Sequence, residues 1–222
     1  AIRQLREQAD PEYRDFAAAL IPGIDKKRML GVRLPELRRL ARRLAKGGLL
    51  QCRARKGETF EETMVRGFLP GYADRAPLAE RLATLEAYVP SITNWSLCDS
   101  CCATCKFAQA HRAETWEWLQ PFLASKEEYR ARFGVVMLLN HFAKSPEWAE
   151  RVADALSRVE ADAFYTAMAV AWCACELCLL HAGMAARLLA PGVLRDEVLA
   201  LTRRKIRESR RSLPTVTIGN GG

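Results

Sequence analysis

The stretch that decides the fold runs Pro35-Glu36-Leu37-Arg38-Arg39-Leu40-Ala41-Arg42-Arg43-Leu44-Ala45-Lys46-Gly47-Gly48. Proline suits the first turn of a helix, and apolar residues follow at helical spacing, namely Leu37, Leu40, Ala41 and Leu44. The basic residues occupy the opposite side, and the Gly47-Gly48 pair ends the helix. This stretch therefore predicts an amphipathic helix with a strongly basic face.

The same helical spacing recurs through most of the chain. Helices are expected over residues 77–88, from 116 onwards, and over 127–142, 148–159, 163–180 and 193–211. Few runs alternate between apolar and polar residues as strands do. Helices of about three to five turns joined by short breaks predict an all-α fold, with antiparallel pairs stacked in an α-solenoid or a curved bundle. No clean sequence repeat is visible, so this prediction rests on spacing.

Length and composition indicate a single domain. The chain has 222 residues, 50% of them hydrophobic, and no Ser/Pro-rich linker divides it. We expect one helical repeat domain over residues 1–212 and a flexible tail over 213–222. No run approaches the roughly 18 apolar residues of a membrane span, and the amino terminus lacks the order of a signal peptide. These features predict a cytoplasmic monomer without membrane contact.

Positive charge is concentrated in two windows. The chain carries 34 Lys and Arg against 26 Asp and Glu, a net charge of +8. Residues 26–56 hold twelve basic residues and one acid, and residues 203–211 hold six basic residues and one acid. Such concentration is typical of a surface that binds phosphates. Two solvated helix faces are the alternative interpretation.

An aromatic ring and a carboxylate lie four residues apart in Asn94-Trp95-Ser96-Leu97-Cys98-Asp99. On a helix this spacing puts Trp95 and Asp99 on one face, together with Cys102 and Lys106. A π-surface beside a fixed anion suits a passing positive charge, such as a sugar cation or an alkylated base. The alternative is a core tryptophan beside a capping or salt-bridged carboxylate.

Seven of the eight cysteines fall in two tight groups, at 98–105 and at 173–178. Both groups lie in helical patterns, and Cys98, Cys101 and Cys105 share one stripe. The first interpretation is small apolar residues packed between helices in a reducing compartment. A tetrahedral metal site is the sharper alternative, because Cys98-x-x-Cys101 could present two thiolates. No glycine-containing knuckle surrounds either group, so we expect no metal and no cofactor.

Four segments of the chain resemble, in order and spacing, the AlkD-like DNA alkylation repair family: Gly31-Val32-Arg33-Leu34-Pro35-Glu36-Leu37-Arg38, Asn94-Trp95-Ser96-Leu97-Cys98-Asp99, Arg130-Ala131-Arg132-Phe133-Gly134-Val135-Val136 and Tyr165-Thr166-Ala167-Met168-Ala169-Val170-Ala171-Trp172. The match covers most of the chain, from about Gly31 to Arg211. The resemblance implies an α-solenoid of HEAT-like helical repeats whose basic concave face holds duplex DNA.

Carried over residue by residue, the resemblance implies a catalytic carboxylate at Asp99, sugar-facing tryptophans at Trp95 and Trp172, and an active-site arginine at Arg132. Helical spacing puts Trp172 on one face with Tyr165, Met168 and either Cys175 or Glu176. A core aromatic is the alternative for Trp172, and a salt bridge is the alternative for Arg132. The residues that we expect to contact DNA phosphates are Arg33, Arg38, Arg39, Lys106, Arg203 and Arg207.

Three functional hypotheses follow. The first is a DNA glycosylase that hydrolyses the N-glycosidic bond of cationic N3- or N7-alkylated purines in duplex DNA, with Asp99 and the tryptophans stabilising the sugar cation. The second is a HEAT-like module that binds bent or branched DNA without turnover. The third is a cysteine-based metal or redox protein. The enzyme is the preferred hypothesis.

Overall fold

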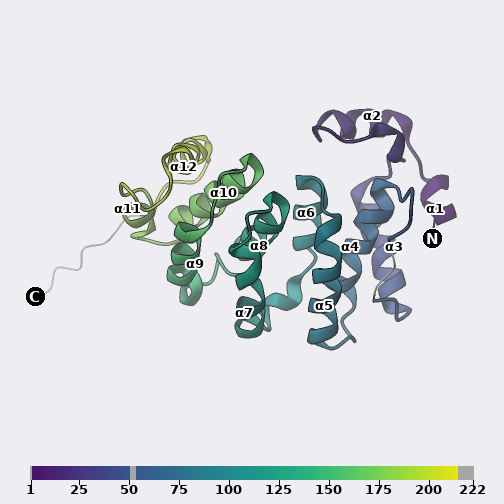
Figure 1. The fold of residues 1–222 in the computed structure, drawn as a ribbon, viewed down its shortest axis with the longest axis horizontal. Helices are drawn as coiled ribbons and strands as arrows, with labels where there is room; N and C mark the ends of the chain where they lie inside the picture. Colours follow the sequence, from purple (N-terminus) through teal and green to yellow (C-terminus); the bar gives the residue numbers. More distant parts are fainter. Residues whose placement is uncertain (1, 51–53, 215–222) are drawn as a thin grey trace, which may run out of the picture. The chain divides into compact units, whose positions relative to one another are not determined.

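In the computed structural model, which describes residues 2–50 and 54–214, every regular element is helical (Figure 1). The α-helices of this described part are α1 (Ile2–Glu7), α2 (Pro11–Ala19), α3 (Leu34–Lys46), α4 (Phe60–Tyr72), α5 (Leu78–Tyr88), α6 (Trp95–Cys102), α7 (Arg112–Leu123), α8 (Glu128–His141), α9 (Pro146–Arg158), α10 (Phe164–Leu180), α11 (Met184–Leu188) and α12 (Asp196–Glu208). Three short 3-10 helices of this described part lie between the α-helices: η1 (Lys26–Arg28), η2 (Val89–Ser91) and η3 (Lys106–Gln109). Within residues 2–50 and 54–214, each helix is too short or too polar to cross a bilayer.

The chain divides into two compact units, residues 1–110 and 111–222, and each is described here by itself. The single domain expected over residues 1–212 stays a prediction. The tail expected over 213–222 lies, from residue 215 onwards, outside the described residues.

In the first unit, α3, α4 and α6 run in the same direction. The Glu61 carboxylate at the start of α4 accepts from the Gly31 amide, just before α3, at 2.7 Å, and the far ends of α3 and α4 line one shallow groove. At the end of α4, Gly71 packs against Thr104, which follows α6. Helix α5 is antiparallel to α4: Arg81, near the start of α5, donates to the carbonyl of Gly71, near the end of α4, at 3.1 Å.

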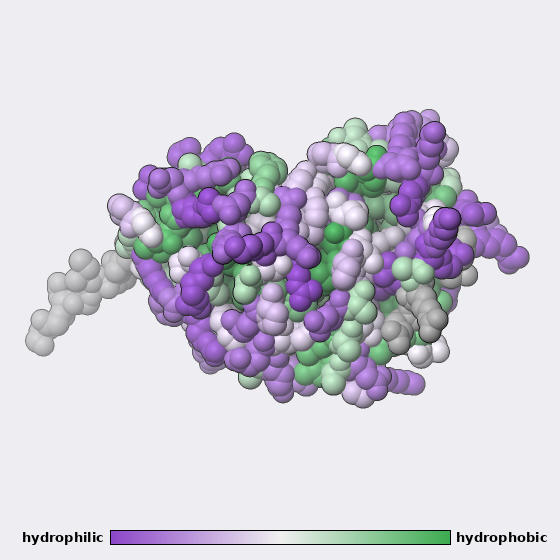
Figure 2. Space-filling model, in the orientation of Figure 1, coloured by the Kyte–Doolittle hydropathy of each residue, from purple (hydrophilic) through white to green (hydrophobic). Residues whose placement is uncertain are grey.

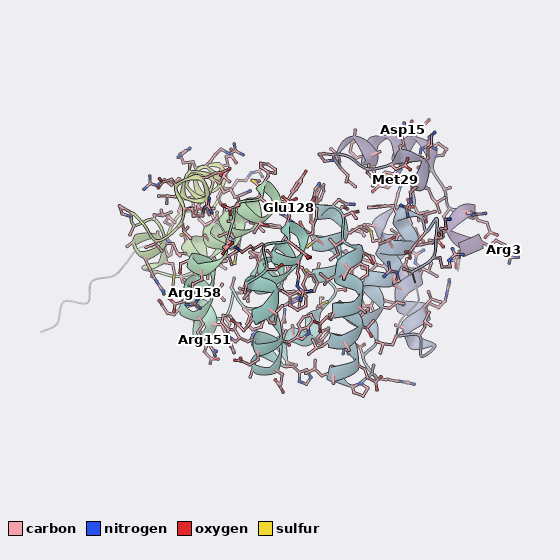
Figure 3. The ribbon with its side chains drawn as sticks, viewed as in Figure 1. Arg3, Asp15, Met29, Glu128, Arg151 and Arg158 are labelled. Carbon is pink, nitrogen blue, oxygen red and sulfur yellow. The ribbon has the colours of Figure 1, made fainter. Side chains whose placement is uncertain are left out.

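In the second unit, α8, α10 and α12 also run in one direction. Glu128, which Figure 3 labels in the first turn of α8, accepts from the Tyr165 amide at the start of α10 at 2.7 Å. Arg195 and Asp162 pair just before α12 and α10, and Arg211, which follows α12, pairs with Glu176 in the second half of α10. Helix α7 is antiparallel to α8. The Arg112 side chain at its start donates to the last-turn carbonyl of α8, at His141.

Rows of parallel helices with oppositely directed neighbours are the repeat-like arrangement that the spacing predicted. The all-α fold class is therefore confirmed, and six of the predicted helices appear with ends shifted by a few residues. The basic concave face stays a prediction.

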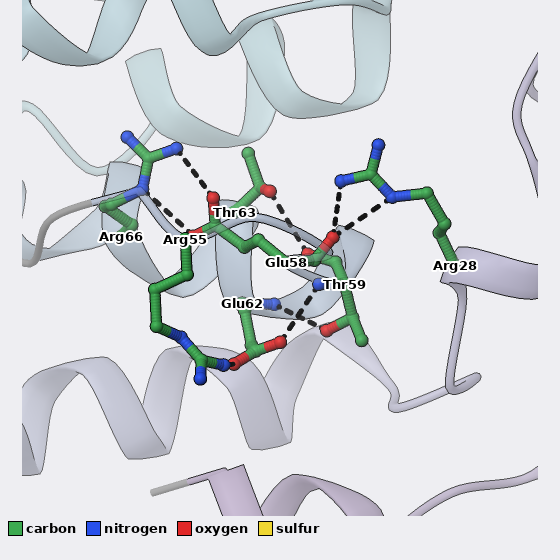
Figure 4. Close-up of polar contacts among 7 residues, drawn as sticks. All are labelled: Arg28, Arg55, Glu58, Thr59, Glu62, Thr63 and Arg66. Carbon is green, nitrogen blue, oxygen red and sulfur yellow. Dashed lines mark hydrogen bonds and ion pairs between the residues drawn. The ribbon is translucent and has the colours of Figure 1, made fainter.

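Helix α4 is missing from the helices predicted above. Its sequence contains Gly67, Pro70 and Gly71, which interrupt helical patterns. The helix begins at a capping box: Thr59 Oγ1 accepts from the Glu62 amide, and Glu62 accepts from the Thr59 amide at 2.9 Å (Figure 4). Capping and burial override the local breakers, since ten of its thirteen residues are buried.

The two glycines of α4 allow its neighbours to pack closely. A Cβ atom on Gly67 would lie 2.4 Å from the Tyr88 ring of α5, and one on Gly71 would lie 2.1 Å from Thr104 Oγ1. Both distances are far below van der Waals contact, so only glycine fits at either of these two contacts.

Glu61 anchors the loop that leads into α3. Its side chain is 1% exposed, and its carboxylate accepts backbone N–H bonds from Leu30 at 3.0 Å, Gly31 at 2.7 Å and Val32 at 3.3 Å. A buried carboxylate is stable when hydrogen-bond donors surround it in this way. The loop is thus tied to α4 rather than held by its own turns.

Candidate functional site

Asn94 sets the start of α6. Its Oδ1 atom accepts from the Leu97 amide at 3.1 Å, which is the N-cap bond, and the residue is 5% exposed. Helix α6 begins at Trp95, so Trp95 and Asp99 lie four residues apart on one helical side. Both are half-buried. The structure therefore places a part-exposed ring and a part-exposed carboxylate one turn apart on a capped helix.

The helical face predicted from Trp95 to Lys106 is shorter than expected. Helix α6 ends at Cys102, and Lys106 lies in the separate 3-10 helix η3, so the prediction that Lys106 continues this face is wrong. The physical reason is the turn after Cys102, where Thr104 Oγ1 donates back to the Cys101 carbonyl at 2.8 Å. Cys102 itself is fully buried.

The cysteines form part of the packed interior. All seven described cysteines are free thiols and all are buried, so the interpretation as core residues is confirmed for them. Cys52 lies outside the described residues. Burial and the neighbouring thiols hold the pKa of Cys102 well above its ordinary value, and burial raises the pKa of Cys178 to about 12. In residues 2–50 and 54–214, no three Cys, His, Asp or Glu side chains are grouped as metal ligands.

In the second unit, Arg132 projects from α8 to the start of α10. It is 6% exposed, its Nη1 donates to the Tyr165 carbonyl at 2.6 Å, and its guanidinium lies 5.9 Å from the centroid of the Tyr165 ring. That ring stacks on Tyr129 with centroids 5.6 Å apart. Arg132 therefore holds the first turn of α10 in place.

Trp172 on α10 is 39% exposed, so the alternative of a core aromatic does not hold. It lines an open pocket of about 210 Å³ together with Cys175, Glu176, Lys205 and Arg211. The Glu176 carboxylate accepts from Arg211 Nη1 at 3.1 Å, which ties the segment after α12 to α10. Trp172, Cys175 and Glu176 of the predicted α10 face line this pocket, whereas Tyr165 and Met168 do not.

Helix α3 presents the densest positive charge in the first unit. An open groove of about 620 Å³ is lined by Pro35, Arg38, Arg39, Arg42, Arg43 and Lys46, with no acid in its lining. Arg39 pairs with Glu36 at 2.5 Å, and the Arg42 guanidinium lies over the Tyr72 ring at 4.7 Å. We call this feature the α3 groove. Its lining matches the phosphate surface expected from the sequence and adds Arg42, Arg43 and Lys46 to the predicted contacts.

The other predicted phosphate contacts are exposed. Arg33 at the start of α3 pairs with Asp10 at 3.1 Å and covers the Tyr13 ring at 4.4 Å. Lys106 is exposed on η3, and Arg203 and Arg207 are exposed on α12. Hydrophilic side chains cover α12 on the face drawn in Figure 2.

Sequence reasoning missed a pocket beside the start of α6, lined among others by Arg28, Glu58, Arg66 and Asn94. These residues come from three separate segments. No local spacing relates them, so only the folded chain brings them together. The one available signal was Asn94 as a helix cap, which marks where α6 begins.

A family model described as DNA alkylation repair enzyme matches residues 1–173. Neither the curated proteins nor the solved structures contain a significant match to this chain.

Proposed function

Because the chain belongs to the DNA alkylation repair enzyme family, we propose that it hydrolyses the N-glycosidic bond of N3- and N7-alkylated purines in duplex DNA. A role in DNA repair follows from the family itself. The bond, the substrate and the residues that act on them are the proposal.

The chemistry follows from the charge of the substrate. An N3- or N7-alkylated purine is cationic, so it leaves without a strong general acid, and positive charge builds on the deoxyribose instead. Water bonds through its oxygen to C1′ of the sugar. The glycosidic electron pair moves to the base and cancels its charge, and the proton of the water passes to a carboxylate or to solvent. A fixed anion beside C1′ is the group that this reaction needs.

The pairing of Trp95 and Asp99 on α6 carries the proposal. Their four-residue spacing and partial exposure let a carboxylate and a π-face meet the same sugar. Asp99 would stabilise the developing cation and orient the water, and the quadrupole of the Trp95 ring would attract the same charge. The helix cap at Asn94 supports this role, because it fixes the direction of α6 before DNA arrives.

In the second unit, we assign Trp172 as a further sugar-facing ring, which its exposure supports. The burial of Arg132 favours a positioning role over direct phosphate contact. Its bond to the Tyr165 carbonyl holds the start of the helix that carries Trp172, and its charge adds to the positive potential. The α3 groove would supply contacts to the DNA backbone.

The deciding experiment is release of free base from a duplex that contains N7-methylguanine, at one stated salt concentration. We expect free 7-methylguanine to accumulate with time and enzyme concentration, above the spontaneous rate. Salt-sensitive binding of the same duplex without any release would instead identify a non-catalytic DNA-binding module, which the α3 groove alone could support.

Exchanging two exposed arginines of the α3 groove should weaken DNA binding mainly at low salt. In the variant Arg39→Gln/Arg42→Gln, we expect the slope of log K against log salt concentration to fall in magnitude by about 1.8, which is 0.9 for each lost phosphate contact. The variant Arg3→Gln/Arg158→Gln is the matched control, because it removes the same charge from two exposed arginines that do not line the groove. Equal slopes in the two variants would remove the groove from the DNA interface.

A further inference from the structure

Helix α10 carries a single charged side chain, and this side chain is an acid on the same face as Trp172. Glu176 is the only charged residue in the 17-residue sequence of α10. It follows Trp172 by four residues, so the carboxylate and the exposed ring lie one turn apart on the same side. An unpaired carboxylate at this place would repel the phosphates of the DNA that Trp172 is proposed to meet. The proposed mechanism gives this acid no role.

Arg211 neutralises Glu176 with two hydrogen bonds. Its Nη1 group donates to Oε2 at 3.1 Å, and its Nη2 group donates to Oε1. The Glu176 side chain is 18% exposed, whereas that of Arg211 is 49% exposed. Both oxygens of the carboxylate are therefore held in a bidentate pair, the arrangement that makes an arginine–carboxylate contact strong and specific in direction.

The chain after α12 is shaped to bring Arg211 to this place. Helix α12 ends at Glu208, and Ser209 is extended, with φ −71° and ψ 141°. The Arg211 amide donates to Ser209 Oγ at 3.1 Å, which fixes a short turn. Ser209 and Arg211 both line the open pocket of Trp172, whereas Arg210 between them does not.

The charges around the exposed ring of α10 cancel only when Arg211 is counted. Two acids, Glu176 and Glu208, and two bases, Lys205 and Arg211, line the pocket. Arg204 also pairs with Glu208 at 3.4 Å from one turn away on α12. Without Arg211 the lining would hold two acids against one base, and Glu176 beside the ring would lose its partner.

We propose that Arg211 is a positioning residue for DNA binding by the second unit: it cancels the charge of Glu176 and thereby lets the phosphate backbone approach the Trp172 ring. Arg211 acts through Glu176 rather than on a phosphate, because its Nη1 and Nη2 groups are directed at the carboxylate. The inference rests on DNA as the ligand of the proposed function, but it does not require turnover.

The test measures equilibrium binding of a lesion-free duplex at one stated, low salt concentration. Arg211→Gln should bind about tenfold more weakly than Arg210→Gln, because both variants lose one positive charge but only the first uncovers a like charge near the phosphates. Arg210 is the matched control, since it is an exposed arginine of the same segment outside the pocket lining.

Three further variants separate neutralisation from direct contact. Glu176→Gln/Arg211→Gln leaves one acid and one base in the lining, so it should bind within about twofold of Arg210→Gln. Arg211→Lys keeps the charge without the bidentate geometry and should stay within about threefold of wild type. Glu176→Gln alone removes only the acid and should bind at least as tightly as wild type.

Several results would overturn the inference. Equal affinities of Arg211→Gln and Arg210→Gln would leave Arg211 without a role in DNA binding. A double variant as weak as Arg211→Gln would make Arg211 a direct phosphate contact. A Glu176→Gln variant that loses thermal midpoint and DNA affinity together would make the pair structural.

The outcome is distinguishable from that of the base-release assay, because this duplex contains no lesion. The expected order of affinities without any base release would refute the glycosylase and keep the role of Arg211. Normal base release with equal affinities of Arg211→Gln and Arg210→Gln would do the reverse. A wild-type protein that binds no duplex at all would overturn both.

Discussion

Asp99→Asn is expected to slow release of 7-methylguanine from duplex DNA by about 10²–10³-fold, the usual loss when one fixed electrostatic contact to a transition state is removed. The amide occupies the same space but carries no charge, so the sugar cation loses its counter-ion. Affinity for the duplex should stay the same or rise slightly, because a negative charge near phosphates disappears. Single-turnover release and equilibrium binding at one salt concentration measure the two effects separately.

The matched control is Asp74→Asn, which removes a carboxylate from an exposed position between α4 and α5 in the same unit. It should release base at the wild-type rate. If Asp99→Asn retains the wild-type rate, Asp99 is not the catalytic carboxylate. If it instead lowers the thermal midpoint and DNA affinity together, its role is structural, and the enzyme hypothesis loses its central residue.

Glu58→Gln should lower the free energy of unfolding by about 3–5 kcal/mol, which is the range for breaking a buried ion pair by removing one partner. Both side chains of the Glu58–Arg66 pair are less than a tenth exposed, and Gln offers the guanidinium only one neutral oxygen. The remaining charge of Arg66 then stays buried against the Tyr88 ring without a counter-charge. Urea unfolding followed by circular dichroism measures this loss.

Two further variants separate charge from packing. Glu80→Gln makes the same exchange at an exposed site of α5 and should stay within about 0.5 kcal/mol of wild type. Glu58→Gln/Arg66→Met removes both charges from the interior and should recover part of the loss. A double variant that is less stable than Glu58→Gln alone would show that Arg66 stabilises the unit through contacts other than this pair.

Much of the fold was predictable because amphipathic spacing is strong in several helices. Helix α3 appears at Leu34–Lys46, as Pro35 and Gly47 indicated. Helix α4 was not predictable, because Gly67 and Gly71 weaken a local pattern, and the reason for their presence is packing against Tyr88 and Thr104. Local propensity gives way where tertiary contacts decide.

The site was predictable in part. Helical spacing alone predicts that Trp95 and Asp99 lie one helical turn apart on the same side of α6, and it also predicts the basic face of α3. The end of α6 before Lys106 depends on a side-chain bond of Thr104, which spacing does not reveal. The exposure of Trp172 and the burial of Arg132 depend on neighbouring helices, so a sequence pattern alone gives neither.

The buried Glu61 carboxylate orders the loop before α3, and this order affects the entropy of DNA binding. A loop whose amides at Leu30, Gly31 and Val32 all bond to one buried side chain should exchange those protons with solvent as slowly as a helix does. The basic helix that follows is therefore already oriented before DNA arrives. The entropy of ordering this segment is lost during folding, so the encounter with the phosphate backbone does not have to supply it.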